Sequence, residues 1–480
     1  MKLPLLQSAD PERPVLWAHG RVLSARALMQ KVASMAAALP TDARYLINLC
    51  ERRDDFLIAF CASLVRGHTN LLPSSRAEGV VEEVVALNAG SYPCDDDFVA
   101  RVCDSLRGES ALPVADTSVA GGSTAMLPGS RNSAPAAALG AEAASLGSDA
   151  ASLCAFELPA EHVAVKAFTS GSTGTPQAHL KFWRSFAGST AQNALRIREC
   201  LTPVYGTARP WIVATVPPQH MYGLETSIIL PLLSDMAVHA ARPLFPADIA
   251  AALAEVPEPR VLVTTPVHMR AIAASGQQFP RTALVVSATA PLDVDLARAI
   301  EKQLDATVLE MFGSTETCVI ASRRTSSERE WHLYPDVILV PDAEGASVNA
   351  PWFVAPMRLQ DLIERHPNNR FTIYGRNADM IEVAGKRASL ADLTRRLLAI
   401  PGVQDAVVFQ PDASASGVVR RVAALVVAPS LTPDAITDQL ARSVDPAFIP
   451  RPLVIVPRLP RNDVGKLPRA QLLAALHSEK

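Results

Sequence analysis

The sequence lacks an excess of basic residues. Its 480 residues contain 45 Lys and Arg against 48 Asp and Glu, which leaves a formal net charge of -3. A protein that binds nucleic acid or an anionic membrane surface carries a basic excess on at least one face. We therefore expect no nucleic-acid partner.

Cysteine pairs and long apolar runs are also missing. The seven cysteines, at positions 50, 61, 94, 103, 154, 200 and 318, form no CxxC pair. Such a scattered, odd set indicates reduced thiols, not a disulfide framework or a zinc site. Near the N-terminus, the longest uncharged apolar stretch is Phe56–Val65, well short of the ~20 residues that a membrane span needs. The N-terminal apolar run is too short for a signal peptide. We expect a cytoplasmic protein with no membrane span.

Glycine is scarce as well, at 23 residues in 480, against a usual share of ~7%. Where so few glycines cluster, the backbone needs them, so the clusters indicate which segments to consider. The stretch 115–152 is an exception, because it combines Gly with Ala, Ser and Pro and has few large apolar residues. We interpret it as a flexible, low-complexity surface insertion.

Short apolar strands alternate with helices along most of the chain. Ser24 is placed to cap a helix that runs to Leu39. A helix over Arg53–Val65 lies between the expected strands Tyr45–Leu49 and Thr69–Leu72. The alternation predicts an α/β fold with a mostly parallel sheet covered on both faces. The later expected elements are the strands Val163–Phe168, Trp211–Val216, Val261–Thr264, Ala283–Val286 and Thr307–Met311 and the helices Pro246–Glu255 and Leu292–Leu304.

The pattern changes near residue 376. We expect two antiparallel strands, Val403–Phe409 and Val418–Val427, and then a helix over Pro433–Ser443. The sequence thus predicts a large N-terminal domain of α/β subdomains, 1–375, and a small α+β C-terminal lid, 376–480.

Four polar segments contain the glycines that stand out. Glycines let backbone N–H groups approach a phosphate, and hydroxyls donate hydrogen bonds to its oxygens. A carboxylate at the end of a parallel strand is suitably placed to hold Mg²⁺ beside nucleotide phosphates. The segments are Thr169–Pro176 (TSGSTGTP), Phe312–Thr317 (FGSTET), Tyr374–Asp379 (YGRNAD) and Leu459–Arg469 (LPRNDVGKLPR).

Each segment alone also has an ordinary structural interpretation. A Ser/Thr/Gly run is often a polar turn, and a Glu in such a turn is often a helix-capping partner. A Gly-Arg pair can be a linker, and Lys466 can be a solvated side chain. The first segment is not a Walker A loop, because GxxxxGK[ST] is absent and Gln177 stands where a lysine is expected.

Together, in this order, the four segments resemble the ANL superfamily of adenylate-forming enzymes, which includes acyl-CoA synthetases, aryl-acid ligases and nonribosomal adenylation domains. TSGSTGTP is similar to the phosphate loop of that superfamily, FGSTET to its YGxTE segment, YGRNAD to its hinge and LPRNDVGK to its C-terminal lysine motif. PPQHMYGLE is similar to the acyl-site segment and SATAPL to the usual SGGAPL. The resemblance covers nearly the whole chain and implies an adenylate-forming domain with a mobile lid.

In such enzymes a carboxylate attacks the α-phosphate of ATP, which gives acyl-AMP and pyrophosphate, and a thiol then takes the acyl group. The resemblance implies ATP and Mg²⁺ as cofactors and a carboxylic acid as substrate. It implies that Glu316 binds Mg²⁺, that Thr315 contacts the α-phosphate and that Lys466 bridges the substrate carboxylate and the α-phosphate. The residues that would cradle the β- and γ-phosphates are Thr169, Ser170, Gly171, Ser172, Thr173 and Gly174.

Further contacts follow from the same resemblance. Phe312 would lie against adenine, Asp361 would hold the ribose hydroxyls and Arg376 would reach the ribose or a phosphate. His220 looks like the gate residue of the acyl site and counts among the catalytic candidates, although it could simply be a buried, satisfied histidine. The other nucleotide-binding candidates are Gly313, Ala288, Thr289 and Ala290, and the other acyl-pocket candidates are Met221, Tyr222, Gly223, Leu224 and Ser287.

Four positions depart from the pattern of the superfamily. Gln177 replaces the loop lysine that helps to order the phosphate loop, and Lys181 is a candidate substitute. Because Lys466, Glu316 and Arg376 match the pattern of the superfamily, we favour an active adenylating enzyme over an inactive homologue. The other departures are Phe312 for tyrosine, Leu359-Gln360-Asp361 for TGD and Ala378 for a charged hinge residue.

One segment bears on the substrate. Residues 173–183 (TGTPQAHLKFW) are similar to a bacterial subgroup with a PxxHxKxW extension. That subgroup is linked to aryl-polyene and xanthomonadin-type pigments and loads hydroxybenzoate-type acids onto acyl carrier protein. The leading hypothesis is an ATP-dependent ligase of this kind. The alternatives are a CoA ligase for a short or medium aliphatic acid and a non-catalytic protein that binds an acyl or AMP ligand.

Overall fold

The structure of the chain is a computed structural model. The predicted insertion at 115–152, the centre of the expected phosphate loop, and residues 418–421 of one expected strand lie outside the described residues. The structure describes residues 1–7, 10–73, 76, 78–104, 155–170, 176–376, 380–383, 386–411, 422–442, 444, 446–462 and 465–477.

The N-terminal part follows the predicted alternation closely. Helix α1 (Ala25–Ala38) begins after Ser24, whose side chain accepts a hydrogen bond from the Ala27 N–H, as predicted. Helix α2 (Arg53–Val65) is buried along its whole length. The remaining helices here are α3 (Glu78–Ala86) and α4 (Asp96–Asp104).

A five-stranded sheet organises this region. Its first four strands are parallel, and the last two, which flank the expected phosphate loop in the sequence, pair antiparallel. The strand order is β6 (Ser91–Cys94), β4 (Tyr45–Asn48), β5 (Thr69–Leu72), β8 (Val163–Ser170) and β9 (Pro176–Phe182).

A second sheet of eleven strands lies beside it in the part of the chain that the structure describes. Strands β2 and β10 to β14 pair in parallel, whereas the strands beyond β14 pair antiparallel. The sheet is therefore mixed and not mostly parallel as predicted. The order is β20 (Asp361–His366), β21 (Arg370–Arg376), β16 (Trp331–Leu333), β15 (Cys318–Arg323), β14 (Thr307–Ser314), β13 (Leu284–Ser287), β12 (Arg260–Thr264), β10 (Trp211–Ala214), β11 (Ala237–His239), β2 (Pro14–Ala18) and β3 (Arg21–Ser24).

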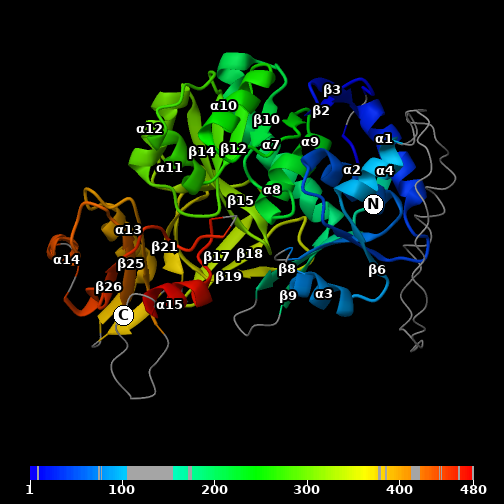
Figure 1. Cartoon of the computed structure of the whole chain (residues 1–480). Coiled ribbons are helices and arrows are strands. Elements are labelled where there is room, and N and C mark those ends of the chain that lie inside the picture. The colour runs from blue at the N-terminus through cyan, green and yellow to red at the C-terminus, as the bar shows by residue number, and fades with distance from the viewer. Residues whose placement is uncertain are drawn as a thin grey trace, which may run out of the picture.

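Helices cover both faces of this sheet (Figure 1). On one face, the apolar sides of α10 (Pro246–Glu255), α11 (Pro266–Ala274) and α12 (Val294–Leu304) pack on the parallel strands. On the other, the long helix α7 (Trp183–Tyr205) contributes to the core. Because parallel strands share their direction, the carboxyl ends of β10, β12, β13 and β14 meet at one edge. The site is built there.

The segment between β10 and β11 is helical but irregular. It consists of α8 (Met221–Leu224), the π-helical η2 (Glu225–Ile229) and α9 (Leu230–Leu232). Smaller sheets complete this part of the chain: β1 (Lys2–Pro4) with β7 (Glu157–Pro159), and β17 (Ile338–Asp342), β18 (Gly345–Asn349) and β19 (Met357–Leu359).

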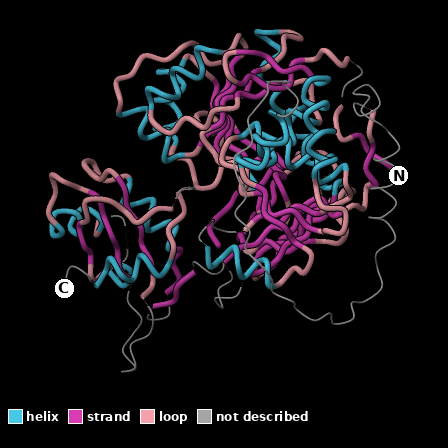
Figure 2. The backbone as a smooth tube through the Cα atoms, turned by 45° about the vertical axis from the view of Figure 1, so that its right-hand side comes forward, coloured by secondary structure: helices cyan, strands magenta, loops and turns pink. Residues whose placement is uncertain are grey.

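The C-terminal elements gather at one side of the molecule (Figures 1 and 2). As predicted, β24 (Asp405–Phe409) and β25 (Ala423–Val427) are antiparallel, and β26 (Leu453–Ile455) joins them in parallel. Helices α13 (Leu390–Leu398) and α14 (Pro433–Leu440) pack on one face of this sheet and α15 (Arg469–His477) on the other. The remaining elements are the hairpin of β22 (Met380–Val383) and β23 (Lys386–Ser389) and the 3₁₀ helix η4 (Pro446–Phe448).

Two expectations from composition can be compared with the described residues. The six described cysteines are free thiols. Within the same residues, every helix is too short or too polar to cross a membrane.

Candidate active site

Strands β8 and β9 lie on either side of the expected phosphate loop in the sequence. Ser170 pairs with Pro176 and Thr169 with Gln177 across the two strands. Residues 171–175, which include the predicted phosphate-binding positions 171–174, lie outside the described residues. This pairing therefore places the two ends of this loop next to each other at an edge of the five-stranded sheet.

Glu316 lies on a tight turn between β14 and β15, beside Thr315. Ser314 Oγ accepts hydrogen bonds from the backbone N–H groups of Glu316 and Thr317, each at 3.2 Å. Gly313 is required here by close packing, because a Cβ at this position would lie 2.1 Å from the carbonyl oxygen of Cys318. The sequence FGSTET thus folds locally into a fixed turn with one carboxylate.

The carboxylate of Glu316 is ionised at neutral pH. Burial acts to raise its pKa, but hydrogen bonds from Ser314 and from its own backbone N–H, and the charges of His179 and Lys181, lower the pKa overall. The side chain is 40% exposed. Proteins bind Mg²⁺ through one or two carboxylates together with substrate phosphates, so this residue fits such an ion. Among the described residues no three His, Cys, Asp or Glu side chains gather into a metal cage.

Strand β9 faces this turn. His179 Nδ1 lies 3.5 Å from Glu316 Oε1, and Lys181 Nζ donates a hydrogen bond to the backbone carbonyl of Glu316. Lys181 is 1% exposed. Its role as a substitute for the missing loop lysine stays a prediction, because residues 171–175 of the loop lie outside the described residues.

A small cavity lies at the carboxyl ends of β10 and β12. Its volume is about 20 Å³, so an acid must displace side chains to enter. Of the predicted acyl-site residues, His220, Tyr222 and Gly223 line it, as does the predicted nucleotide-binding residue Thr289. The other lining residues, which the sequence motifs did not identify, are Val216, Pro217, Thr265 and His268.

His268 is held firmly at this cavity. Its Nδ1 lies 3.1 Å from both Thr215 Oγ1 and Thr265 Oγ1. Burial and the charge of Arg242 lower its pKa below the ordinary value for histidine, so the ring is neutral at pH 7 and can donate or accept a hydrogen bond. His268 belongs to none of the sequence motifs. Only its position shortly after the predicted strand Val261–Thr264 could have indicated it as a site residue.

The other predicted acyl-site residues are less accessible. The Tyr222 hydroxyl donates to the Val286 carbonyl oxygen at 3.0 Å. Leu224 is fully buried, and Met221 packs against the same core cluster. Ser287 is also buried, and its Oγ has no hydrogen-bond partner within the described residues. Of the predicted set, the structure therefore brings only part to the cavity.

Arg53 stabilises the backbone beside this cavity, because it binds the carbonyl oxygen of the lining residue Val216. It is fully buried and donates hydrogen bonds to the carbonyl oxygens of Ala214 at 3.0 Å, Val216 at 2.8 Å and Ala241 at 3.0 Å. These oxygens lie at the ends of β10 and β11, where the strands leave their carbonyls unpaired.

The predicted nucleotide-binding residues lie along the same edge. Thr289 has a φ of 80°, which is rare for a β-branched residue and typical of functional sites. Ala288 and Ala290 flank it. Phe312 contacts the rings of Trp331 and Phe371, with centroids 5.4 and 5.9 Å away.

Asp361 and Arg376, the predicted ribose contacts, are paired residues on neighbouring antiparallel strands. They face each other in the β20–β21 register. Asp361 is largely buried, at 8% exposure. The structure thus brings together two residues that lie in different motifs of the sequence.

Lys466 is exposed on a tight turn held by Arg461. Arg461 donates two hydrogen bonds of 2.8 Å to the carboxylate of Asp405 and one of 2.9 Å to the Gly465 carbonyl. The Lys466 N–H donates to Asn462 Oδ1 at 2.9 Å. A Cβ on Gly465 would lie 3.0 Å from Val267 Cγ2. The turn therefore lies against the start of α11, one residue from the cavity residue His268.

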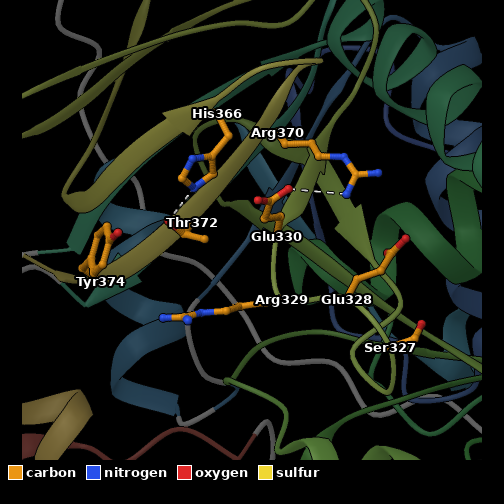
Figure 3. Close-up of a pocket in the computed structure, with 8 residues that line it drawn as sticks. All are labelled: Ser327, Glu328, Arg329, Glu330, His366, Arg370, Thr372 and Tyr374. Carbon is orange, nitrogen blue, oxygen red and sulfur yellow. Dashed lines mark hydrogen bonds and ion pairs between the residues drawn. The ribbon is translucent and has the colours of Figure 1, made fainter.

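A groove of about 470 Å³ also lies on the outer side of the β20–β21 hairpin (Figure 3). Glu330 pairs with Arg370 at 3.4 Å, and His366 bonds to Thr372 at 3.0 Å. Its charges are partly paired with one another, and none of its lining residues is a predicted site residue. The groove is lined by Ser327, Glu328, Arg329, Glu330, His366, Arg370, Thr372 and Tyr374.

Comparison with known proteins identifies the family of this chain. Residues 97–348, more than half of the chain, match the family described as AMP-binding enzyme. The chain belongs to this family. It is an AMP-forming ligase, and the resemblance to the ANL superfamily is confirmed.

Curated relatives of this AMP-binding enzyme include several CoA ligases. It is 30% identical over 322 residues to a 4-coumarate–CoA ligase from Halorhodospira halophila, covering 64% of this chain and 76% of the relative. It is 27% identical over 359 residues to a sulfoacetate–CoA ligase from Cupriavidus necator, covering 65% of this chain and 66% of the relative.

Solved structures show the same fold along nearly the whole chain. ATP-bound MatB from Rhodopseudomonas palustris aligns with a TM-score of 0.74 and 18% identity, covering 98% of this chain and 97% of that one. The O-succinylbenzoate CoA synthetase from Bacillus subtilis, in complex with AMP, aligns with a TM-score of 0.73 and 16% identity, covering 98% of both chains.

Proposed function

We propose that this AMP-binding enzyme adenylates a hydroxybenzoate-type aromatic acid and transfers the acyl group to the phosphopantetheine thiol of an acyl carrier protein. The proposal of an aromatic acid as the substrate rests on the cavity that His220 and His268 line. Two imidazoles offer hydrogen bonds to a ring hydroxyl, and a neutral His268 can serve as donor or acceptor. A relative named for 4-coumarate, a hydroxylated aromatic acid, supports this class of substrate.

The first step joins the acid to AMP. A carboxylate oxygen of the acid attacks the α-phosphorus of ATP, and the bond to the bridging oxygen breaks to release pyrophosphate. Lys466 neutralises the two anions as they approach. The packing of its turn against Val267 supports this role, because Val267 directly precedes the cavity residue His268. Positioning and charge compensation account for most of such catalysis.

Glu316 would hold Mg²⁺, and the ion would offset charge on the phosphate oxygens. The ionised, accessible carboxylate on a fixed turn supports the assignment. The β8–β9 hairpin carries the phosphate-binding loop, Thr169–Gly174, with Thr315 at the α-phosphate. Asp361 and Arg376 contact the ribose from paired strands.

In the second step, a thiolate attacks the acyl carbonyl carbon and AMP leaves. The region 376–480 is the lid, which changes its position between the adenylation step and the thiol-transfer step. The relatives named as CoA ligases support CoA equally well as the acceptor. The free thiols of the described cysteines support a cytoplasmic location.

ATP–pyrophosphate exchange over a panel of carboxylic acids tests the first step. The panel contains benzoate, 3- and 4-hydroxybenzoate, 4-coumarate, malonate and a series of aliphatic acids. We expect the fastest exchange with a hydroxylated aromatic acid. Fastest exchange with an aliphatic acid would refute the substrate class, and no exchange with any acid would favour a non-catalytic binding protein.

The acceptor is tested separately. Radiolabelled acid is supplied with ATP and either CoA or a holo acyl carrier protein, and the labelled product is separated by mass. We expect label on the carrier protein; label on CoA alone would replace this part of the proposal with an acyl-CoA ligase.

Lys466→Ala tests the carboxylate-activating group. We expect this variant to lose exchange by at least ~100-fold while ATP still binds, as measured by calorimetry. Exchange at the wild-type rate would show that another residue activates the carboxylate.

A further inference from the structure

Strand β9 directs two side chains to the same residue. Successive side chains of a strand point to opposite faces, so His179 and Lys181 share a face, whereas Leu180 between them is 50% exposed. His179 reaches the Glu316 carboxylate, with Nδ1 3.5 Å from Oε1. Lys181 holds the backbone carbonyl of the same residue. Strand β9 thus contacts both the side-chain carboxylate and the backbone carbonyl of Glu316.

A buried carboxylate, Glu225, holds the strand that follows the Glu316 turn. Glu225 is 1% exposed, and its Oε2 accepts hydrogen bonds from Ser189 Oγ at 2.9 Å and from the Val319 N–H at 3.1 Å. Burial raises the pKa of Glu225, while the Val319 N–H and the charge of Lys181 act in the opposite direction. Glu225 therefore fixes β15 just beyond the turn whose Glu316 carbonyl Lys181 binds.

This network joins three segments of the site. Lys181 lies on β9, which directly follows the expected phosphate loop in the sequence, and Glu316 belongs to the turn between β14 and β15. Glu225 begins the π-helical segment η2, directly after the acyl-site helix α8; such π-helical turns are frequent at functional sites. Cys318, which ends the turn, has a positive φ of 60°, and burial raises the pKa of its thiol while the charge of Lys181 acts to lower it.

We propose that Lys181 is a positioning residue for Glu316: it holds the metal-binding turn against strand β9, so that the Mg²⁺ site is formed before the nucleotide arrives. The inference rests on the proposed function, since Glu316 is the Mg²⁺ ligand only there. His179 restrains the carboxylate from the same face.

Stability alone is a weak reason for this arrangement. Replacing a buried ion pair by apolar residues of similar volume is often neutral or stabilising, whereas removing one partner alone leaves an uncompensated charge. A purely structural role could therefore be filled by apolar side chains at both positions. The hydrogen bond from Lys181 to the Glu316 carbonyl could not, because it requires a donor.

The test measures how much Mg²⁺ strengthens ATP binding. ATP affinity is determined by calorimetry in Mg²⁺ and in EDTA for wild type and for Lys181→Met, and the ratio of the two dissociation constants is compared. The control is Lys166→Met. Lys166 lies on the partner strand β8 and donates to Asn88 Oδ1 at 2.7 Å, away from the Glu316 turn.

We expect Lys181→Met to lower the Mg²⁺-dependent ratio about tenfold, in line with the loss of a residue that orients a metal ligand. Lys166→Met should leave the ratio within about twofold. A merely structural role would weaken ATP binding equally in Mg²⁺ and in EDTA and leave the ratio unchanged, which would overturn the inference.

A second variant is tested in case Lys181→Met does not fold. Lys181→Met with Glu225→Gln removes both buried charges and keeps an acceptor for Ser189 and Val319. This protein should fold and still show the reduced ratio; a wild-type ratio would overturn the inference. If the wild-type protein itself gains no ATP affinity from Mg²⁺, the Mg²⁺ role in the proposed function fails together with the inference. If only the variants match wild type, the proposed function stands.

Discussion

Arg461 should control adenylation without touching the substrate. Its guanidinium forms a bidentate pair with Asp405, at 2.8 Å for both bonds, and a third bond to the Gly465 carbonyl, at 2.9 Å. Gly465 directly precedes Lys466. Arg461→Met keeps much of the apolar stem but releases all three bonds, so the turn that carries Lys466 loses its internal support.

The magnitude follows from the surroundings of the pair. The side chains of Arg461 and Asp405 are 18% and 19% exposed, so the pair is only partly screened by water. Hydrogen bonds to charged groups contribute about 1.5–3 kcal/mol each, but they are not additive. Asp405 can regain some water in the variant, so we expect a loss of about 2–3 kcal/mol in folding free energy of the C-terminal region.

The larger effect should be on the exchange rate. A displacement of about 1 Å in a positioned group can cost about 100-fold in rate, so we expect ATP–pyrophosphate exchange by Arg461→Met to fall about 10- to 100-fold in kcat. The dissociation constant of ATP should change little. Exchange is measured at saturating acid, alongside thermal unfolding.

A double-mutant cycle with Asp405→Asn measures how much of the effect comes from the interaction between Arg461 and Asp405. If the two residues act together on the turn, the double variant should lose little more than either single one. Arg469→Met is the control: its guanidinium bonds to the Gln410 carbonyl at 2.9 Å in the same region. Exchange by Arg461→Met within twofold of wild type would refute the reasoning.

Three further predictions follow from single features. His268→Phe should reduce the preference for a hydroxybenzoate over benzoate about tenfold, the effect of one net hydrogen bond; exchange kinetics with both acids measure it, and an unchanged preference would exclude His268 as the hydroxyl contact. Gly313→Ala should lower stability by about 1–3 kcal/mol, because its Cβ would lie 2.1 Å from the Cys318 carbonyl oxygen; a denaturant titration with an unchanged midpoint would contradict this. Shortening 115–152 should leave the free energy of unfolding nearly unchanged, since the segment has few large apolar residues; a marked fall in the urea midpoint would show that it packs.

Much of the fold could be predicted from local patterns. The bounds of α2 (Arg53–Val65), β5 (Thr69–Leu72) and α10 (Pro246–Glu255) agree with those read from the sequence. Short-range signals decide such elements: apolar periodicity, a capping side chain such as Ser24, and proline at a helix start. The mixed pairing beyond β14 was not predicted, because strand partners depend on contacts between segments that are distant in the chain.

The site divides in the same way. The motifs indicated Glu316 and Lys466, because each lies in a short segment whose residue types suit phosphate chemistry. His268 has no motif, and it reaches the cavity only because β12 ends beside β10. Lys181 was a candidate for the role of the loop lysine, but the sequence did not indicate that the packing of β9 against the Glu316 turn buries its side chain.

The sequence by itself therefore determined the family and the local elements, since these depend on residue type and near neighbours. The tertiary structure alone decided which side chains reach the site. Burial and orientation are set by segments that meet only after folding, and a lysine has the same charge in the sequence whether it will face a phosphate or a buried glutamate.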